Sequence, residues 1–174
     1  MEWKSILGAV AFLGAVVGFV PYVYSIYKNK TKPHLFTWLV WAILTSMIFG
    51  IQFTQGAGPG AWHMGITALT SIAIMGLSFF YGEKKGSKLD WAAFLLSLAA
   101  IPLWLVAKDP ASAAVLLTLI DVMAFWPTIS KTWRKPYQEN LFYYGIWLVR
   151  YPLATLAVQN MNVANLVYPA TWSV

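Results

Sequence analysis

Long apolar stretches, separated by short polar ones, make up most of the chain. Six of them are long enough to form a helix across the apolar core of a bilayer, which takes about 20 residues. They span residues 3–27, 35–55, 61–81, 91–107, 111–130 and 141–159. A seventh apolar stretch begins near Val163 and holds only about half of a span before Val174. The pattern therefore predicts an all-α transmembrane protein whose seventh helix is incomplete.

The composition agrees with a chain surrounded by a lipid bilayer. Hydrophobic residues make up 59% of the chain and charged residues only 10%, whereas soluble domains carry about 25% charged residues. The net charge of +6 does not predict nucleic-acid binding, because Lys and Arg occupy short loops and form no basic face. The chain has no cysteine, which excludes disulfides, thiolate catalysis and cysteine-based metal sites.

Basic residues mark every second loop between the predicted spans. Nine of the 12 Lys and Arg residues lie in loops 28–34, 82–90 and 131–140. The alternating loops 56–60, 108–110 and 160–162 hold one Lys, Lys108. Because cytoplasmic loops carry the excess of Lys and Arg, we expect the basic loops to be cytoplasmic. The sequence thus predicts a multi-pass protein of the cell (inner) membrane with its N-terminus outside.

An internal repeat appears when the chain is aligned with itself at an offset of 106 residues. The matched pairs are Leu13 and Leu119, Val16 and Val122, Phe19 and Phe125, Pro21 and Pro127, Leu35 and Leu141, Phe36 and Phe142, and Trp41 and Trp147. The offset covers four helices, an even number, so the two copies have the same orientation. Such parallel repeats, related by an axis along the membrane normal, occur in some transporters.

The repeat predicts a plan of three helices, one linker helix and three helices. The first three-helix repeat covers residues 1–82 and the linker helix covers residues 83–110. The second repeat covers residues 111–174, and its third helix is incomplete.

Two dipeptides, Pro21-Tyr22 and Pro127-Thr128, stand at the basic-loop end of the first helix of each repeat. In the first copy a basic loop and a polar helix entry follow, in the segment KNKTKPHLFTW. These features resemble the PQ-loop superfamily, which includes the SWEET and SemiSWEET sugar transporters. Tyr22 and Thr128 occupy the place of that family's Gln. The resemblance extends over nearly the whole chain through the three-one-three plan, and it implies a small membrane transporter.

The resemblance also implies which residues face a substrate. The family places a Trp on the second helix of each repeat, and Trp41 and Trp147 match those positions. It places an Asn on the third helix, which in the first copy has none. The resemblance therefore implies that Thr67, Thr70 or Ser71 takes that role.

Asp121 and Arg150 lie well inside the fifth and sixth predicted spans. Each is about ten residues from its basic loop, so at about 1.5 Å per residue they share one depth. An unpaired charge there costs at least ~2.5–3.5 kcal/mol, so we expect the two to pair. The pair serves either as a structural salt bridge or as a substrate-binding or proton-coupling site. Ala15 and Leu44 occupy the matching positions of the first copy, and an asymmetric site suits an anionic or zwitterionic ligand.

Trp147, Arg150 and Tyr151 share one face of the sixth span, at positions i, i+3 and i+4. Aromatic rings beside a guanidinium allow cation–π contact, and the alternative is a lipid-facing aromatic group. We expect Trp38 to be an interfacial anchor and His63 an interfacial histidine at the outer end of its span.

Pro21 and Pro127 fall inside the first and fifth spans. A proline removes one helical hydrogen bond and kinks the helix. The matched pair predicts either two hinges that open the cytoplasmic side or two static kinks.

These features together predict a carrier for a small polar solute that works by alternating access. Transport is predicted to be facilitative, and proton coupling through Asp121 is a variant of this prediction. The predicted substrate path is Trp41, Thr67, Asp121, Trp147, Arg150 and Tyr151. The alternative is a non-transporting membrane receptor or assembly partner of the same fold. No catalytic, cofactor or metal motif is present in the sequence, so neither an enzyme nor a bound cofactor is expected. Self-association into a homo-oligomer is compatible with the pattern.

Overall fold

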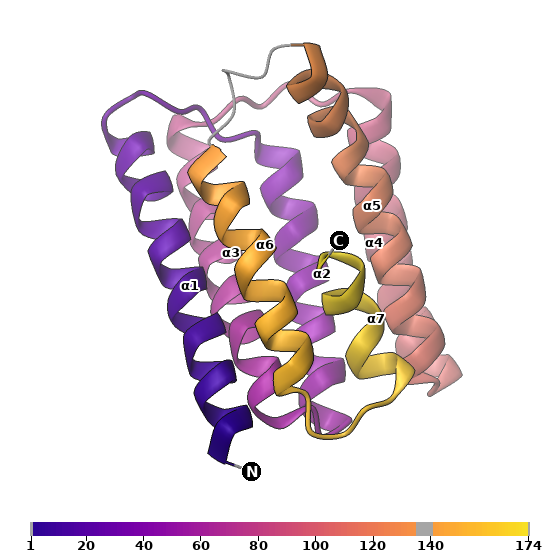
Figure 1. Ribbon diagram of the computed structural model, residues 1–174. Helices are drawn as coiled ribbons and strands as arrows, with labels where there is room; N and C mark the ends of the chain where they lie inside the picture. The colour runs from indigo at the N-terminus through magenta and orange to yellow at the C-terminus, as the bar shows by residue number, and fades with distance from the viewer. Residues whose placement is uncertain (1, 135–140, 174) are drawn as a thin grey trace.

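The computed structural model describes residues 2–134 and 141–173, and these residues form helices and short connections without a strand (Figure 1). Within these ranges the side chains of residues 90, 93, 100, 103, 104, 107, 126–134, 141, 143 and 144 are not described. The elements are α1 (Glu2–Tyr27), α2 (Leu35–Thr54), the 3₁₀ helix η1 (Gly58–Ala61), α3 (Trp62–Tyr81), α4 (Lys88–Ala107), α5 (Pro110–Arg134), α6 (Leu141–Ala157) and α7 (Val163–Thr171).

The all-α prediction is confirmed, and the bounds of the helices lie within about four residues of the apolar stretches. In the described part of the chain, three helical segments are long and apolar enough to cross a membrane: Glu2–Tyr27, Leu35–Thr54 and Gly58–Tyr81. The apolar part of α5, Pro110–Phe125, is shorter. The chain is therefore compatible with a membrane protein.

The outer face of α1 is apolar along its length. Its exposed large side chains are Trp3, Ile6, Val10, Leu13, Val17, Val20, Tyr24 and Tyr27. They recur every three or four residues, so they form one stripe along a helix of 26 residues, about 39 Å long. The opposite face is buried and built of small residues such as Gly8, Ala11 and Ala15. Contact of an uninterrupted apolar stripe of this length with water is unfavourable, whereas contact with lipid acyl chains suits it.

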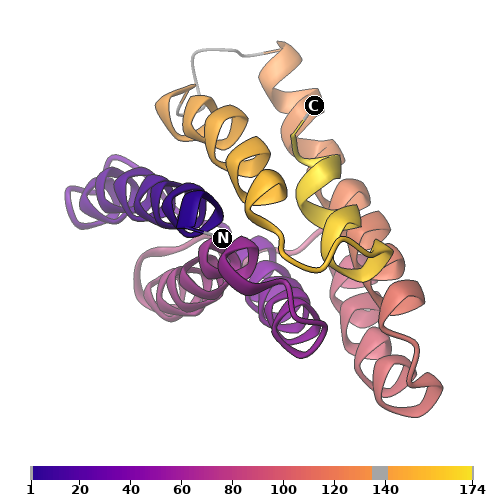
Figure 2. The same cartoon turned by 60° about the horizontal axis from the view of Figure 1, so that its bottom comes forward.

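Two helices, α3 and α7, each pack against two others. Helix α3 packs against both α1 and α2, and α7 packs against both α5 and α6. Neither α1 with α2 nor α5 with α6 forms an extensive contact through described residues. Helix α1 also lies on α6 and α2 lies on α5, and α4 covers α5 and α2. Figure 2 shows α7 between α6 and α5.

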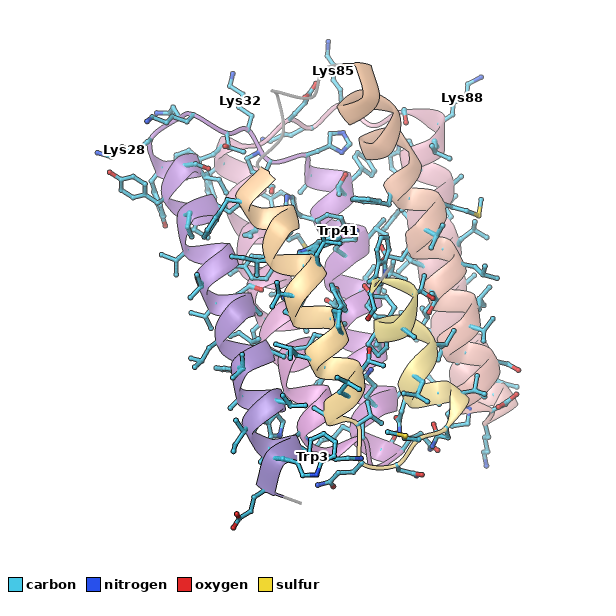
Figure 3. The ribbon with its side chains drawn as sticks, in the orientation of Figure 1. Trp3, Lys28, Lys32, Trp41, Lys85 and Lys88 are labelled. Carbon is cyan, nitrogen blue, oxygen red and sulfur yellow. The ribbon has the colours of Figure 1, made fainter. Side chains whose placement is uncertain are left out.

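The connections after α1 and α3 meet at one end of the bundle. The Leu35 amide donates to the Glu83 carbonyl and the Glu83 amide donates to the Pro33 carbonyl, both at 2.9 Å. Lysine side chains gather at this end (Figure 3), and they include Lys28, Lys32, Lys85 and Lys88. Most of the third predicted basic loop, residues 135–140, lies outside the described residues.

The connections after α2 and α6 meet at the opposite end. The Gln159 amide donates to the Ala57 carbonyl over 3.0 Å. Gly56 and Gly58 turn the chain there with φ of 71° and 61°, a conformation that glycine adopts without steric cost. The two ends are therefore distinct in charge, as the alternation of basic loops predicts.

Helix α5 begins with a capped turn. The Asp109 carboxylate accepts hydrogen bonds from the Ala111 amide, at 3.1 Å, and from the Ser112 hydroxyl. Such bonds satisfy amide groups that a helix start leaves without a partner. The Ser112 hydroxyl also holds the pKa of the Asp109 carboxyl below its usual value.

Close contact between α1 and η1 yields a prediction about two glycines. A Cβ added to Gly8 would lie 2.5 Å from the Pro59 carbonyl oxygen and 2.7 Å from the Pro59 Cβ, whereas one added to Gly145 meets no described atom within 4 Å. We expect Gly8→Ala to destabilise the protein by about 1–3 kcal/mol through overpacking. Gly145→Ala should stabilise it by about 0.5–1 kcal/mol through helix propensity. Thermal unfolding of both variants in detergent checks the pair, and equal shifts would contradict the contact.

Candidate functional site

Two charged side chains lie in the interior of the bundle. Arg150 on α6 is 2% exposed and Asp121 on α5 is 3% exposed, and no other Asp, Glu, Lys or Arg is buried among the described side chains. Sequence reasoning brought them to one depth and expected them to pair directly. That expectation is wrong, because the hydrogen bonds of each group go to neutral side chains on other helices.

The Arg150 guanidinium is held by one hydrogen bond and three aromatic rings. Its Nη1 donates to the Thr67 hydroxyl on α3 over 3.1 Å. Its Cζ lies 4.9 Å from the Tyr151 ring centroid, 5.8 Å from that of Trp147 and 5.9 Å from that of Phe19. Cation–π attraction of this kind is strongest where water is excluded. The Nε and Nη2 atoms are buried and have no hydrogen-bond partner in the described chain.

The Asp121 carboxylate is likewise only partly satisfied. Its Oδ2 accepts a hydrogen bond from the Tyr168 hydroxyl on α7 over 2.7 Å. The indole groups of Trp41 and Trp172 lie nearby. Its Oδ1 is buried without a partner among the described residues, as is the Trp172 Nε1. A carboxylate can accept several hydrogen bonds, so Asp121 keeps an open acceptor.

Two tyrosines lie between the charged groups. The Tyr151 ring stacks beneath the guanidinium, and its centroid is 6.3 Å from that of Tyr168. Thr67, Arg150, Tyr151, Tyr168 and Asp121 thus form a continuous row that runs from α3 through α6 and α7 to α5, and we call it the polar row. A row contributed by four helices changes if those helices move relative to one another.

Trp41 and Trp147, the matched residues of the two sequence copies, contact each other. Their ring centroids are 6.0 Å apart. Trp147 also packs against Phe125 at 5.8 Å and Trp172 at 5.7 Å. Figure 3 places Trp41 inside the bundle between its two ends. The six residues of the predicted path are therefore brought into one region: Trp41, Thr67, Asp121, Trp147, Arg150 and Tyr151.

His63 and Trp38 differ from their predicted interfacial placement. His63 is fully buried, its Nδ1–H donates to the Gly60 carbonyl over 2.9 Å, and its ring meets the Tyr151 ring edge-on at 5.4 Å. Its Nε2 has no partner in the described region. Trp38 is buried against Trp41, with ring centroids 5.0 Å apart. Both residues pack against aromatic side chains of the predicted path, His63 against Tyr151 and Trp38 against Trp41.

Both predicted hinge residues lie inside helices. Pro21 stands on the exposed side of α1, which continues as a helix on both sides of it. Pro127 falls within α5, and its side chain lies outside the described part. The hinge role stays a prediction.

Sequence reasoning missed Tyr168 and Trp172, which face Asp121. Both belong to the short final stretch, which the sequence predicts to be an incomplete span. A tyrosine within an apolar segment that also holds Asn165 was the available signal. Among the described residues no group of three His, Cys, Asp or Glu side chains is placed to bind a metal ion.

The geometry defines an all-helical protein, compatible with a membrane, that carries a buried polar row. No family model, curated protein or solved structure matches the chain. Any function must therefore be argued from the polar row itself.

Proposed function

We propose that the protein is a membrane carrier for a small polar solute, and that the polar row is its substrate path. The observation that carries the proposal is the state of Arg150 and Asp121. Both are buried, they do not pair directly, and each retains polar atoms without a partner in the described chain. Charges used only for structure are cheapest when paired and fully hydrogen-bonded. Open donors and acceptors at the centre of an apolar bundle favour a ligand that completes them.

The packing supports two parallel three-helix repeats around this path. In each proposed repeat the third helix contacts the first and second. In this arrangement α1 corresponds to α5 and α2 corresponds to α6. The contact of α1 with α6 therefore has an equivalent in the contact of α5 with α2. Trp41 and Trp147 occupy equivalent positions and touch, as residues beside a symmetry axis do. Helix α4 is then the linker. Rocking of the two repeats about such an axis gives alternating access, with Pro21 and Pro127 as the proposed hinges.

The orientation follows from the lysine-rich end of the bundle. We place this end in the cytoplasm because positive charge is retained on that side. The end opposite, where the connections after α2 and α6 meet, then faces outward, together with the N-terminus. The protein is proposed to reside in the cell (inner) membrane.

Cysteine labelling checks this orientation. The chain has no cysteine of its own, so only an introduced cysteine is labelled. Met161, 59% exposed, lies at the proposed outer end, and Lys85 is exposed at the proposed cytoplasmic end. We expect a membrane-impermeant maleimide to label Met161→Cys in intact cells and Lys85→Cys only after permeabilisation. The reverse pattern would invert the proposed orientation, and labelling of both in intact cells would argue against a spanning bundle.

Uptake into proteoliposomes tests the carrier itself. We expect purified protein reconstituted into liposomes to take up at least one solute from a labelled panel of amino acids, organic acids, amines and sugars faster than empty liposomes. Uptake should follow a concentration gradient without a proton gradient if transport is facilitative. The alternative is a non-transporting receptor or assembly partner, and specific binding of a panel solute with no uptake of any would favour it.

A further inference from the structure

The free edge of the Arg150 guanidinium has a defined shape. Nη1 is occupied by Thr67, whereas Nε and Nη2 are both unpartnered within the described chain. These two nitrogens lie on one side of the planar group, and their N–H bonds are parallel. This is the edge that binds two oxygens of one carboxylate at the same time. The open donors therefore match a planar, two-oxygen anion.

Among the described side chains, no group fills this edge. Asp121 is the only buried carboxylate among the described side chains, and its Oδ2 is engaged by Tyr168. Around the guanidinium stand the rings of Phe19, Trp147 and Tyr151. Rings exclude water and lower the local dielectric, which strengthens a charge-assisted hydrogen bond and makes an unfilled donor costly. Within the described part of the chain no carboxylate is available to this edge, and a bound solute can supply one.

Asp121 supplies the opposite pole. Its free Oδ1 accepts from a donor, and a cationic group satisfies a buried carboxylate best. The two poles carry opposite charges, so a solute with one negative and one positive group adds no net charge to the interior. A simple anion or a simple cation would leave one buried pole without a counter-charge. The polar row thus matches a dipolar solute.

We propose that the site binds a zwitterion, with its carboxylate on the Nε and Nη2 edge of Arg150 and its ammonium group on Asp121 Oδ1. The apolar part of the solute then lies along Tyr151 and Trp147. This proposal names the substrate class of the proposed carrier. It rests on the proposed function only where transport of the solute is concerned, because binding is measured separately. Phosphate fits less well, because its second negative charge finds no second buried cation in the described region.

Ligand-induced thermal stabilisation of the purified protein tests this binding. The probes are zwitterionic amino acids with one to five carbons between the charged groups, the matching amines without a carboxylate, the matching acids without an amine, and inorganic phosphate. We expect at least one zwitterion to raise the melting temperature, and its half-molecules and phosphate to leave it unchanged at the same concentration. Stabilisation by a half-molecule as large as that by the zwitterion, or none by any zwitterion, would overturn the proposal.

Two variants separate recognition by the guanidinium edge from a general effect of charge. Arg150→Lys keeps the charge and loses the two-nitrogen edge, so the zwitterion should bind at least about tenfold more weakly. Thr67→Val keeps the guanidinium and releases its Nη1, so affinity should fall less. Lys108→Gln, at an exposed position in the connection before α5, is the matched control and should bind normally. Unchanged affinity in Arg150→Lys would overturn the assignment even if a zwitterion binds.

Failure of this proposal is distinguishable from failure of the proposed function. Zwitterion binding that depends on Arg150, with no uptake into liposomes, would support the site and refute the carrier. Uptake of a neutral solute that Arg150→Lys leaves unchanged would support the carrier and refute the site.

Discussion

Arg150→Met should destabilise the folded protein by about 3–5 kcal/mol, the range for a change that leaves a buried charge uncompensated. The loss has two physical sources. Asp121 remains buried without any counter-charge in the described interior, and the contacts of the guanidinium with Thr67 and three aromatic rings disappear. The measurement is unfolding by a denaturing detergent titrated into mild micelles, followed by the fluorescence of the protein's ten tryptophans.

Adding Asp121→Asn to Arg150→Met should restore part of that stability. The asparagine keeps the shape and an acceptor for Tyr168, and it removes the uncompensated charge. A double-mutant cycle should give a coupling of roughly 0.5–3 kcal/mol, the range for side chains that share a network. Lys108→Met, which removes an exposed charge, should leave stability nearly unchanged and serves as the control. Strict additivity of the two single changes would mean that the polar row does not connect them energetically.

The helices themselves were predictable because their lengths are dictated by the solvent around them. A chain of apolar stretches bounded by charged loops leaves little freedom in where a helix starts, and α1 and α2 begin and end within a residue of their predictions. Even α7, at nine residues, follows from the place where the apolar pattern resumes after residue 162. The distribution of lysine likewise predicted which connections share an end.

The rotation of each helix about its axis could not be predicted in the same way. Asp121 and Arg150 have similar depths, yet depth does not say whether two side chains point toward each other. Arg150 turns toward Thr67 on α3, and Asp121 turns toward Tyr168 on α7. His63 shows the same limit, because its position near a helix start suggested an interface while its neighbours enclose it. These outcomes depend on which helices become neighbours, which a single sequence without homologues does not reveal.

The contact between Trp41 and Trp147 was not predicted, although the sequence assigned both residues to the substrate path. Trp41 and Trp147 match at an offset of 106 residues, and equivalent residues of two parallel copies approach each other only near the axis that relates them. In the proposed arrangement of two parallel repeats, their contact at 6.0 Å puts that axis beside the charged groups. Asp121 and Arg150 have no charged equivalents in the first copy, so they make the site beside this axis asymmetric. An asymmetric site suits a solute with two different ends.

Asp121→Asn and Arg150→Gln should each reduce the initial rate of zwitterion uptake by roughly 10- to 100-fold, and this is the largest functional effect that we expect. Asp121→Asn keeps the shape of the side chain and removes one charge-assisted hydrogen bond to the solute, worth about 1.5–3 kcal/mol. Arg150→Gln shortens the side chain and removes the two donors that face the carboxylate. Radiolabelled uptake is measured in proteoliposomes and normalised to protein that elutes as a single folded species. Lys108 is exposed in the connection before α5 and is not part of the polar row. The Lys108→Gln variant should therefore transport at the unaltered rate.

Tyr168→Phe separates the two roles of Asp121 in that assay. It removes the hydroxyl that holds Oδ2 while leaving the carboxylate free to meet the solute. If Asp121 acts by binding, the change should raise the concentration for half-maximal uptake by a modest factor and leave the maximal rate nearly intact. If Asp121 instead only stabilises the fold through Tyr168, the variant should lose stability without any change in the concentration dependence of uptake. Because the two roles move different observables, one saturation curve and one unfolding curve for Tyr168→Phe decide between them.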